Sequence, residues 1–172
     1  MGMYPGGNIV RVTPTVIAGT PDQHDIMFDA TEIQNAVASR GGISRLMAVY
    51  FIDVDNENHD MDLIFMENQT NLGTVDAAAS ISDSDIKAAN IIGGLKVDYS
   101  DNSIDLNSNQ SLAGFYGGNA AGDDIGYPTG PLMLLKAAEG STSVYFTGIA
   151  REAIAFASTS DLVVMFHLEY IS

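Results

Sequence analysis

The stretch from Ile43 to Val54 predicts a strand whose two faces are both apolar. Nearly every residue from Leu46 to Val54 is apolar. With simple alternation, one face carries Leu46, Ala48, Tyr50 and Ile52, and the other carries Met47, Val49 and Phe51. A strand that is apolar on both faces must be covered on both faces. We therefore expect a central strand with the protein core on one side and a neighbouring subunit, loop or partner on the other.

Further short apolar segments, separated by polar and glycine-rich turns, predict eight or nine strands in all. The expected strands are 9–17, 25–29, 43–54, 61–66, 95–99 (with a start as early as Ile91), 111–116, 131–136, 143–150 and 161–171. In the last of these, Val163, Met165, His167 and Glu169 share one side. Residues 100–110 predict a turn or hairpin loop, and residues 117–130 form the longest loop. Such spacing is typical of an all-β domain.

Helical signals are few. Residues 80–90 predict a helix of about two turns, with Ser82 as its N-cap and Asp83 and Asp85 at its positive end. Residues 31–39 favour one or two helical turns, although a strand is also compatible with them. The expected fold is all-β, a two-sheet antiparallel jelly-roll-like sandwich with one short helix. We expect an N-terminal arm over residues 1–8 and a single domain over residues 9–172.

The composition excludes several classes of function. The chain of 172 residues has 22 acidic and 7 basic residues, a formal net charge of −15. Phosphate backbones and anionic membrane surfaces repel such a protein, so no nucleic acid and no membrane is expected as a partner. No apolar run approaches the roughly 20 residues of a membrane span. The absence of cysteine excludes disulfides, thiolate zinc sites and cysteine nucleophiles.

No pattern of catalytic residues is visible. His24 and His59 lie in polar turns and His167 in a strand, and no nucleophile elbow, P-loop or zinc-binding H-E-x-x-H motif is present. We predict that the protein is not an enzyme and needs no cofactor. Residues 53–62 are the densest acidic stretch, but Asn58 and Ile64 stand where an EF-hand needs glycine and glutamate. A looser calcium site, with Asp53, Asp55 and Glu57 as weak candidates, stays open beside the simpler interpretation of a solvated turn.

Contacts with a partner are predicted at two places. The N-terminal arm and the strand after it carry an aromatic ring, an apolar side chain and one of the few cations. Three further aromatic residues flank the long glycine-rich loop. The candidate contact residues are Tyr4, Ile9, Arg11, Phe115, Tyr116 and Tyr127.

Several segments in the same order resemble the small β-sandwich capsid decoration (cement) proteins of tailed bacteriophages, which are encoded beside the major capsid protein. The matching segments are 12–16 (VTPTV), 52–53 (ID), 62–65 (DLIF), 76–78 (DAA), 82–85 (SDSD), 92–94 (IGG) and 156–162 (FASTSDL). The resemblance extends over most of the chain from about Ile9. The loop 117–130 looks like an addition to the family pattern.

The resemblance implies a virion structural protein, a jelly-roll trimer on the outer surface of the capsid. Its partners would be the major capsid protein and copies of itself, and it would stabilise the phage head by bridging capsomers. An alternative is a receptor- or carbohydrate-binding β-sandwich module of a phage tail or head fibre. A calcium-dependent enzyme or lectin built on residues 53–62 is the third hypothesis.

Overall fold

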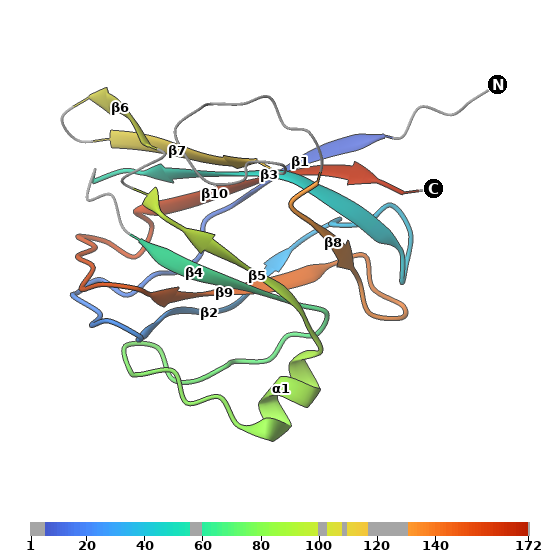
Figure 1. Cartoon of the computed structure of the whole chain (residues 1–172), viewed down its shortest axis with the longest axis horizontal. Helices are drawn as coiled ribbons and strands as arrows, with labels where there is room; N and C mark the ends of the chain where they lie inside the picture. Colours follow the sequence, from blue (N-terminus) through green and yellow to red (C-terminus); the bar gives the residue numbers. More distant parts are fainter. Residues whose placement is uncertain (1–5, 56–59, 100–102, 108–109, 117–130, 172) are drawn as a thin grey trace.

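The chain folds into a sandwich of two antiparallel sheets with one short helix (Figure 1). A computed structural model describes residues 6–55, 60–99, 103–107, 110–116 and 131–171. The first sheet contains, in spatial order, β1 (Gly7–Val12), β10 (Leu162–Tyr170), β3 (Ile43–Asp53), β7 (Gln110–Tyr116) and β6 (Ser103–Asn107), and β8 (Met133–Lys136) also pairs with β3. The second contains β2 (Ile26–Ile33), β9 (Val144–Ala150), β4 (Met61–Met66) and β5 (Ile91–Val97). The helix α1 spans Asp83–Ala89.

The strand order is that of a jelly roll. The order β1-β10-β3-β8 in one sheet faces the order β2-β9-β4-β5 in the other, and the chain changes sheet at most connections. Strands β6 and β7 lie in the chain between β5 and β8, and in space they extend the first sheet beyond β3. The predicted all-β class and two-sheet architecture are therefore confirmed, and the folded unit contains strands from both ends of the described chain.

Strand β3 is central in the first sheet, as predicted. It pairs with β10 on one side, and with β7 and β8 on the other. The predicted division of its faces is wrong at Leu46, which packs in the core beside Val49 and Phe51. The register with β10 shifts at this point, where His167 pairs with Ala48 and Leu168 pairs with Leu46. Met47 is thus an extra residue in a β-bulge, and a bulge reverses the alternation of the residues that follow it.

Four phenylalanine rings from both sheets form the centre of the core. The ring of Phe146 on β9 lies 5.3 Å from Phe28 and 5.0 Å from Phe166, measured between ring centroids. Phe65 on β4 also contacts Phe146 and Phe166. A Cβ at Gly148 would lie 2.6 Å from the ring of Phe28, so only glycine lets this ring pack against β9. These contacts hold the two sheets together.

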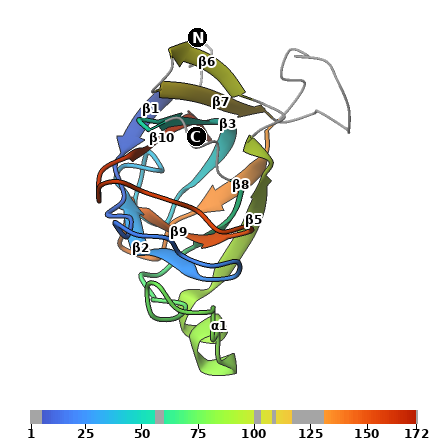
Figure 2. The same cartoon turned by 90° about the vertical axis from the view of Figure 1, so that its left-hand side faces the viewer.

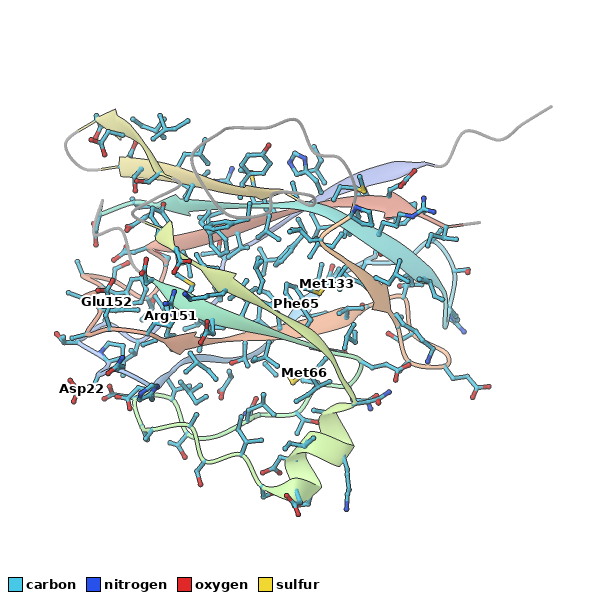
Figure 3. The ribbon with its side chains drawn as sticks, in the orientation of Figure 1. Asp22, Phe65, Met66, Met133, Arg151 and Glu152 are labelled. Atoms are coloured by element: carbon cyan, nitrogen blue, oxygen red, sulfur yellow. The ribbon has the colours of Figure 1, made fainter. Side chains whose placement is uncertain are left out.

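The outer face of the second sheet is covered by the connection between β4 and β5, which contains α1 (Figure 2). Met66 points away from the sandwich interior toward this connection, whereas Phe65 points between the sheets (Figure 3). A small second cluster forms here from Ala30, Met66, Leu72 and Ala89, with Ile64, Ile81 and Tyr145 packed against it. The helix begins as predicted at Ser82, whose side chain and that of Asp85 form a reciprocal capping box.

Three local predictions are corrected by the structure. Residues 31–39 are not helical, because Thr31 to Ile33 continue β2 and pair with β9. Residues 100–110 were expected to form a loop, yet β6 pairs there with β7. Gly7 and Asn8, assigned to the arm, are the first residues of β1. In the part of the chain that the structure describes, no helix has the length and apolarity needed to span a membrane.

Candidate interaction surface

The outer face of the first sheet is built from four rows of residues that run across its strands. Backbone register places the following residues side by side: Val163, Ile52, Leu112 and Ile104; Arg11, Met165, Tyr50 and Gly114; Ile9, His167, Ala48 and Tyr116; Gly7, Glu169, Arg45 and Leu134. We call these residues the open sheet face. The alternate residues of β10, namely Val164, Phe166 and Leu168, belong to the core. Successive residues along β10 thus face the open sheet face and the core in turn, and both environments are largely apolar.

The open sheet face is apolar, although the chain as a whole is strongly acidic. Ile9 is 61% exposed, Ile104 57% and Leu134 53%. No described helix or strand lies over this face, in contrast to the second sheet (Figures 1 and 2). Its one carboxylate among the described side chains, Glu169, pairs with Arg45 at 2.9 Å. The three exposed side chains lie on separate strands, and Ala48 and Val163 on the same face are buried, with 4% and 6% of their surface exposed. Apolar side chains grouped on an outer face are typical of an interaction site.

Tyr50 and His167 lie in the middle of the open sheet face. Their ring centroids are 4.8 Å apart. Partial burial lowers the pKa of His167 below its ordinary value, because a charged imidazole would lose hydration there. The histidine is therefore neutral at neutral pH. The centre of the face consequently presents two adjacent rings without a formal charge.

The predicted contact residues are divided by the structure between two environments. Ile9 and Arg11 both lie on the open sheet face, on its edge strand β1. Phe115 is partly buried and packs against the core, with its ring 5.6 Å from that of Phe51, and its role as a loop-tip contact stays a prediction. The backbone of Tyr116 pairs with Ala48. Tyr4 and Tyr127 lie outside the described residues.

Sequence reasoning missed the residues that form the middle of this face. Met165 and Tyr50 share one cross-strand row, and Val163 and Ile52 share the next. A usable signal was present, because β3 and β10 are both apolar on two sides. The sequence did not reveal that these two strands are neighbours in one sheet.

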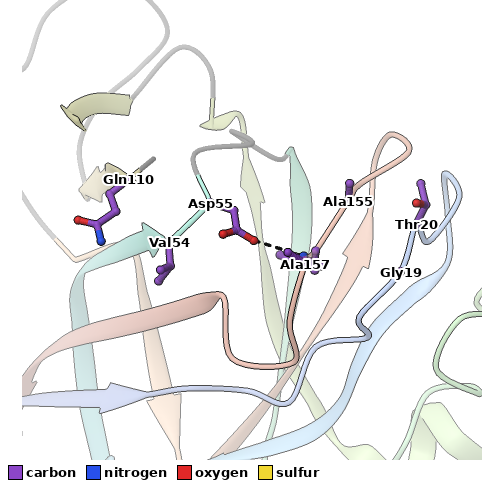
Figure 4. Close-up of a pocket in the computed structure, with 8 residues that line it drawn as sticks. Gly19, Thr20, Val54, Asp55, Gln110, Ala155 and Ala157 are labelled. Atoms are coloured by element: carbon purple, nitrogen blue, oxygen red, sulfur yellow. Dashed lines mark hydrogen bonds between the residues drawn. The ribbon is translucent and has the colours of Figure 1, made fainter. Parts of the chain in front are cut away.

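An open hollow at one end of the sandwich offers little chemistry (Figure 4). Its lining residues are Gly19, Thr20, Val54, Asp55, Gln110, Ala155, Phe156 and Ala157. Asp55 accepts a hydrogen bond from the backbone N–H of Ala157 at 3.3 Å. A hydrogen bond with the carboxyl group of Asp161 raises the pKa of Asp55. The lining contains no histidine, cysteine or lysine, so it lacks the common pair of a histidine base and a nucleophile.

The acidic turn after β3 uses its carboxylates within the protein. Asp53 is buried and accepts a hydrogen bond from the backbone N–H of Asp55 at 2.9 Å. Glu57 lies outside the described residues. Among the residues with described positions, no three acidic, histidine or cysteine side chains are grouped as a metal site requires. The looser calcium site remains a prediction that the described residues do not support.

Arg151, which follows β9, lies among three carboxylates at one end of the second sheet (Figure 3). Its guanidinium is 3.8 Å from the nearest carboxylate oxygens of Asp60 and Asp62, and it donates a hydrogen bond to Asp98. That hydrogen bond lowers the pKa of Asp98, because it favours the ionised carboxylate. The second half of the predicted acidic stretch is thus neutralised by a cation distant in sequence, and its role here is structural.

Replacing Arg151 with methionine should lower the free energy of unfolding by about 1–2 kcal/mol, because three neighbouring carboxylates would then repel one another. The expected loss of stability is small because the side chains of Asp62 and Asp98 are 46% and 40% exposed, so water screens their charges. Urea denaturation at low and high salt measures the effect, which should shrink as salt rises. The exposed Arg40, changed to methionine, is the control. Equal losses in both variants would contradict the role assigned to Arg151.

No protein-family model matches this sequence, and no curated protein matches it. The features of the molecule that bear on its function are therefore the jelly-roll fold, the charge and the open sheet face.

Proposed function

We propose that this chain is a non-enzymatic structural protein of a tailed-bacteriophage head, a decoration protein that binds the outer surface of the capsid and bridges capsomers. The observation that carries the proposal is the contrast between the two sheets. One outer face is packed beneath α1, and the other presents rows of largely apolar side chains in which the one carboxylate among the described residues is paired. A protein that presents apolar side chains on one outer sheet face is suited to binding other proteins.

The proposed mechanism is mechanical. A subunit that lies across a seam between capsomers adds contact area at that seam, and internal pressure must break these contacts before the shell opens. Each contact can be modest, because the symmetry of a capsid repeats it many times and several contacts of one oligomer act together. The major capsid protein and copies of this chain would be the partners, with a trimer as the expected assembly.

The charge supports an external position on the shell. The formal net charge of −15 disfavours binding to packaged or released DNA. Four of the cations are held in ion pairs: Arg45 with Glu169, Lys96 with Asp98, Lys136 with Glu67, and Arg151 with its acidic neighbours. The basic residues are thus largely used within the molecule. The similarity of the segments between Val12 and Leu162 to phage decoration proteins supports the same proposal.

Quantitative mass spectrometry of purified phage particles tests the proposal. We expect this chain at a copy number on the order of hundreds per particle, comparable to that of the major capsid protein. Particles assembled without it should release their DNA at a lower temperature and under a weaker osmotic shock. A few copies per particle would instead favour the receptor-binding or carbohydrate-binding module of a fibre. Absence from particles, or unchanged resistance of particles that lack the chain, would overturn the proposal.

A further inference from the structure

A groove beside β2 combines hydroxyl and carboxylate groups from segments that lie far apart in the sequence. Its polar side chains are those of Thr13, Thr15, Asp29, Thr31 and Thr159, and we call it the threonine groove. We propose that the threonine groove binds a neutral saccharide through the carboxylate of Asp29 and the hydroxyl groups of its threonines. This activity goes beyond the capsid contact of the proposed function and does not depend on it.

One wall of the groove is the segment in which the chain crosses from the first sheet to the second. Pro14 follows the end of β1 and has no N–H group with which to extend the pairing with β10. The N–H of Val16 donates a hydrogen bond to the backbone oxygen of Thr159 at 3.1 Å, and the N–H of Ile17 donates one to Met27 of β2 at 3.3 Å. These bonds fix the crossing segment beside β2, so the groove is held in shape by the backbone.

The opposite wall is β2, at a point where this strand is bulged. Phe28 pairs with Gly148 and Thr31 with Phe146, so a step of three residues on β2 faces a step of two on β9. The hydroxyl of Thr31 donates a hydrogen bond to the backbone oxygen of Asp29 at 2.8 Å. A bulge of this kind re-aims a side chain, and here the side chain of Asp29 is exposed in the groove.

The polar groups of the groove are available to a ligand. Within the described part of the chain, the carboxylate of Asp29 has no hydrogen-bond or ion-pair partner, and neither have the hydroxyls of Thr13, Thr15 and Thr159. An ionised carboxylate accepts hydrogen bonds at both oxygens, and a threonine hydroxyl both donates and accepts. Neighbouring hydroxyls of a sugar ring can therefore donate to the two oxygens of Asp29 and exchange hydrogen bonds with the threonines.

The groove also has the apolar surface that a sugar ring requires. Each threonine carries a methyl group beside its hydroxyl, and the half-buried Ile17 and Val75 complete the lining. A sugar ring likewise combines hydroxyls at its rim with C–H groups on its faces. The volume of the groove is about 630 Å³, within the range of about 300–1,000 Å³ for small-molecule sites.

Other classes of ligand fit this lining less well. Its described residues include no lysine, arginine or histidine, and the chain has a formal net charge of −15, so phosphates and acidic sugars are repelled. A single carboxylate supplies too few oxygen ligands for a calcium ion. Because the groove is open, we expect a dissociation constant on the order of 1–10 mM for one sugar unit. Many copies on one surface can bind a polysaccharide more tightly through repeated weak contacts.

Proton–nitrogen correlation NMR of the full-length chain tests the inference. Glucose, galactose, mannose and N-acetylglucosamine are titrated separately to about 50 mM, well above the expected dissociation constant. At least one sugar should cause saturable shifts concentrated at the amides of the threonine groove. Asp29→Ala removes both carboxylate oxygens and should raise the dissociation constant about tenfold or more. Thr15→Val removes one hydroxyl at nearly constant shape and should raise it about threefold to tenfold.

Thr20→Val and Glu139→Ala are the matched controls, because both residues are exposed and lie outside the groove. They should leave the dissociation constant unchanged. Asp29 and Thr15 are also exposed, so the spectra of all variants should remain those of a folded protein. The inference is overturned if none of the four sugars binds saturably, if the shifts lie away from the groove, or if the groove variants bind like the controls.

These outcomes are distinct from those that test the proposed function. A chain that is abundant on phage heads but binds none of the sugars would overturn the saccharide site and leave the decoration role intact. A chain that binds a sugar in this groove but is absent from particles would do the reverse.

Discussion

Replacing Phe146 with alanine is expected to lower the free energy of unfolding by about 3–5 kcal/mol, the usual cost of removing a buried aromatic side chain. Phe146 is fully buried and contacts the rings of Phe28, Phe65 and Phe166. Phe166 belongs to the opposite sheet, so the substitution removes packing between the sheets as well as within one. A domain of this size is stable by about 5–15 kcal/mol, and the loss would be a large fraction of the total.

Urea denaturation followed by circular dichroism measures this loss. The control is Leu134→Ala on β8, where the side chain is 53% exposed and its removal leaves no internal cavity. We expect a change of less than about 1 kcal/mol for that variant. If Phe146→Ala were no more destabilising than Leu134→Ala, the aromatic cluster could not be what holds the two sheets together.

Local sequence patterns predicted the elements whose signals are complete within a few residues. The capping box at Ser82 and Asp85 is such a signal, and the helix begins there. The two-sided apolar pattern of Ile43–Asp53 is another, and this strand is central in its sheet. The bulge at Met47 has no comparable signal, because it is defined by the register with β10, more than a hundred residues further along the chain.

The wrong predictions share this dependence on distant partners. The residues of 31–39 are compatible with a helix by propensity, yet Thr31 and Ile33 are held extended by pairing with Phe146 and Val144 of β9. Residues 103–107 are too polar to predict a strand, and β6 exists because β7 offers it an edge with which to pair. Tertiary pairing overrides weak local preference in such segments.

The candidate surface was predictable only in part. The side of β10 that carries Val163, Met165 and His167 was correctly grouped from alternation, and Ile9 and Arg11 were proposed as contacts. What joins them into one surface is the adjacency of β1, β10 and β3, which follows from the jelly-roll connections rather than from any local pattern. That Phe115 packs against the core could not be predicted locally, because its side of β7 depends on the same topology.

Raising the pH from about 10 to about 12 is expected to remove about 2 kcal/mol of stability through Tyr99. Its side chain is fully buried, and burial raises its pKa to about 12, with the negative charge of Asp53 contributing in the same direction. Its hydroxyl donates a hydrogen bond to the backbone oxygen of Ser111 at 3.3 Å and accepts one from the Ser111 hydroxyl at 3.1 Å. Ionisation would place a charge beside the ring of Phe51.

The sign follows from the direction of the pKa shift. The folded protein holds the proton more tightly than the unfolded chain, so the contribution of Tyr99 to stability is complete below pH 10, the ordinary tyrosine pKa. It declines as the pH rises toward the folded value of about 12. Urea midpoints measured between these two pH values should fall for the unmodified chain. In Tyr99→Phe, which loses about 1 kcal/mol of hydrogen bonding at neutral pH, the alkaline fall should be smaller by the share due to Tyr99. Parallel decreases in both proteins would show that the fold does not raise the pKa of Tyr99, and its burial would then have no part in the alkaline limit of the fold.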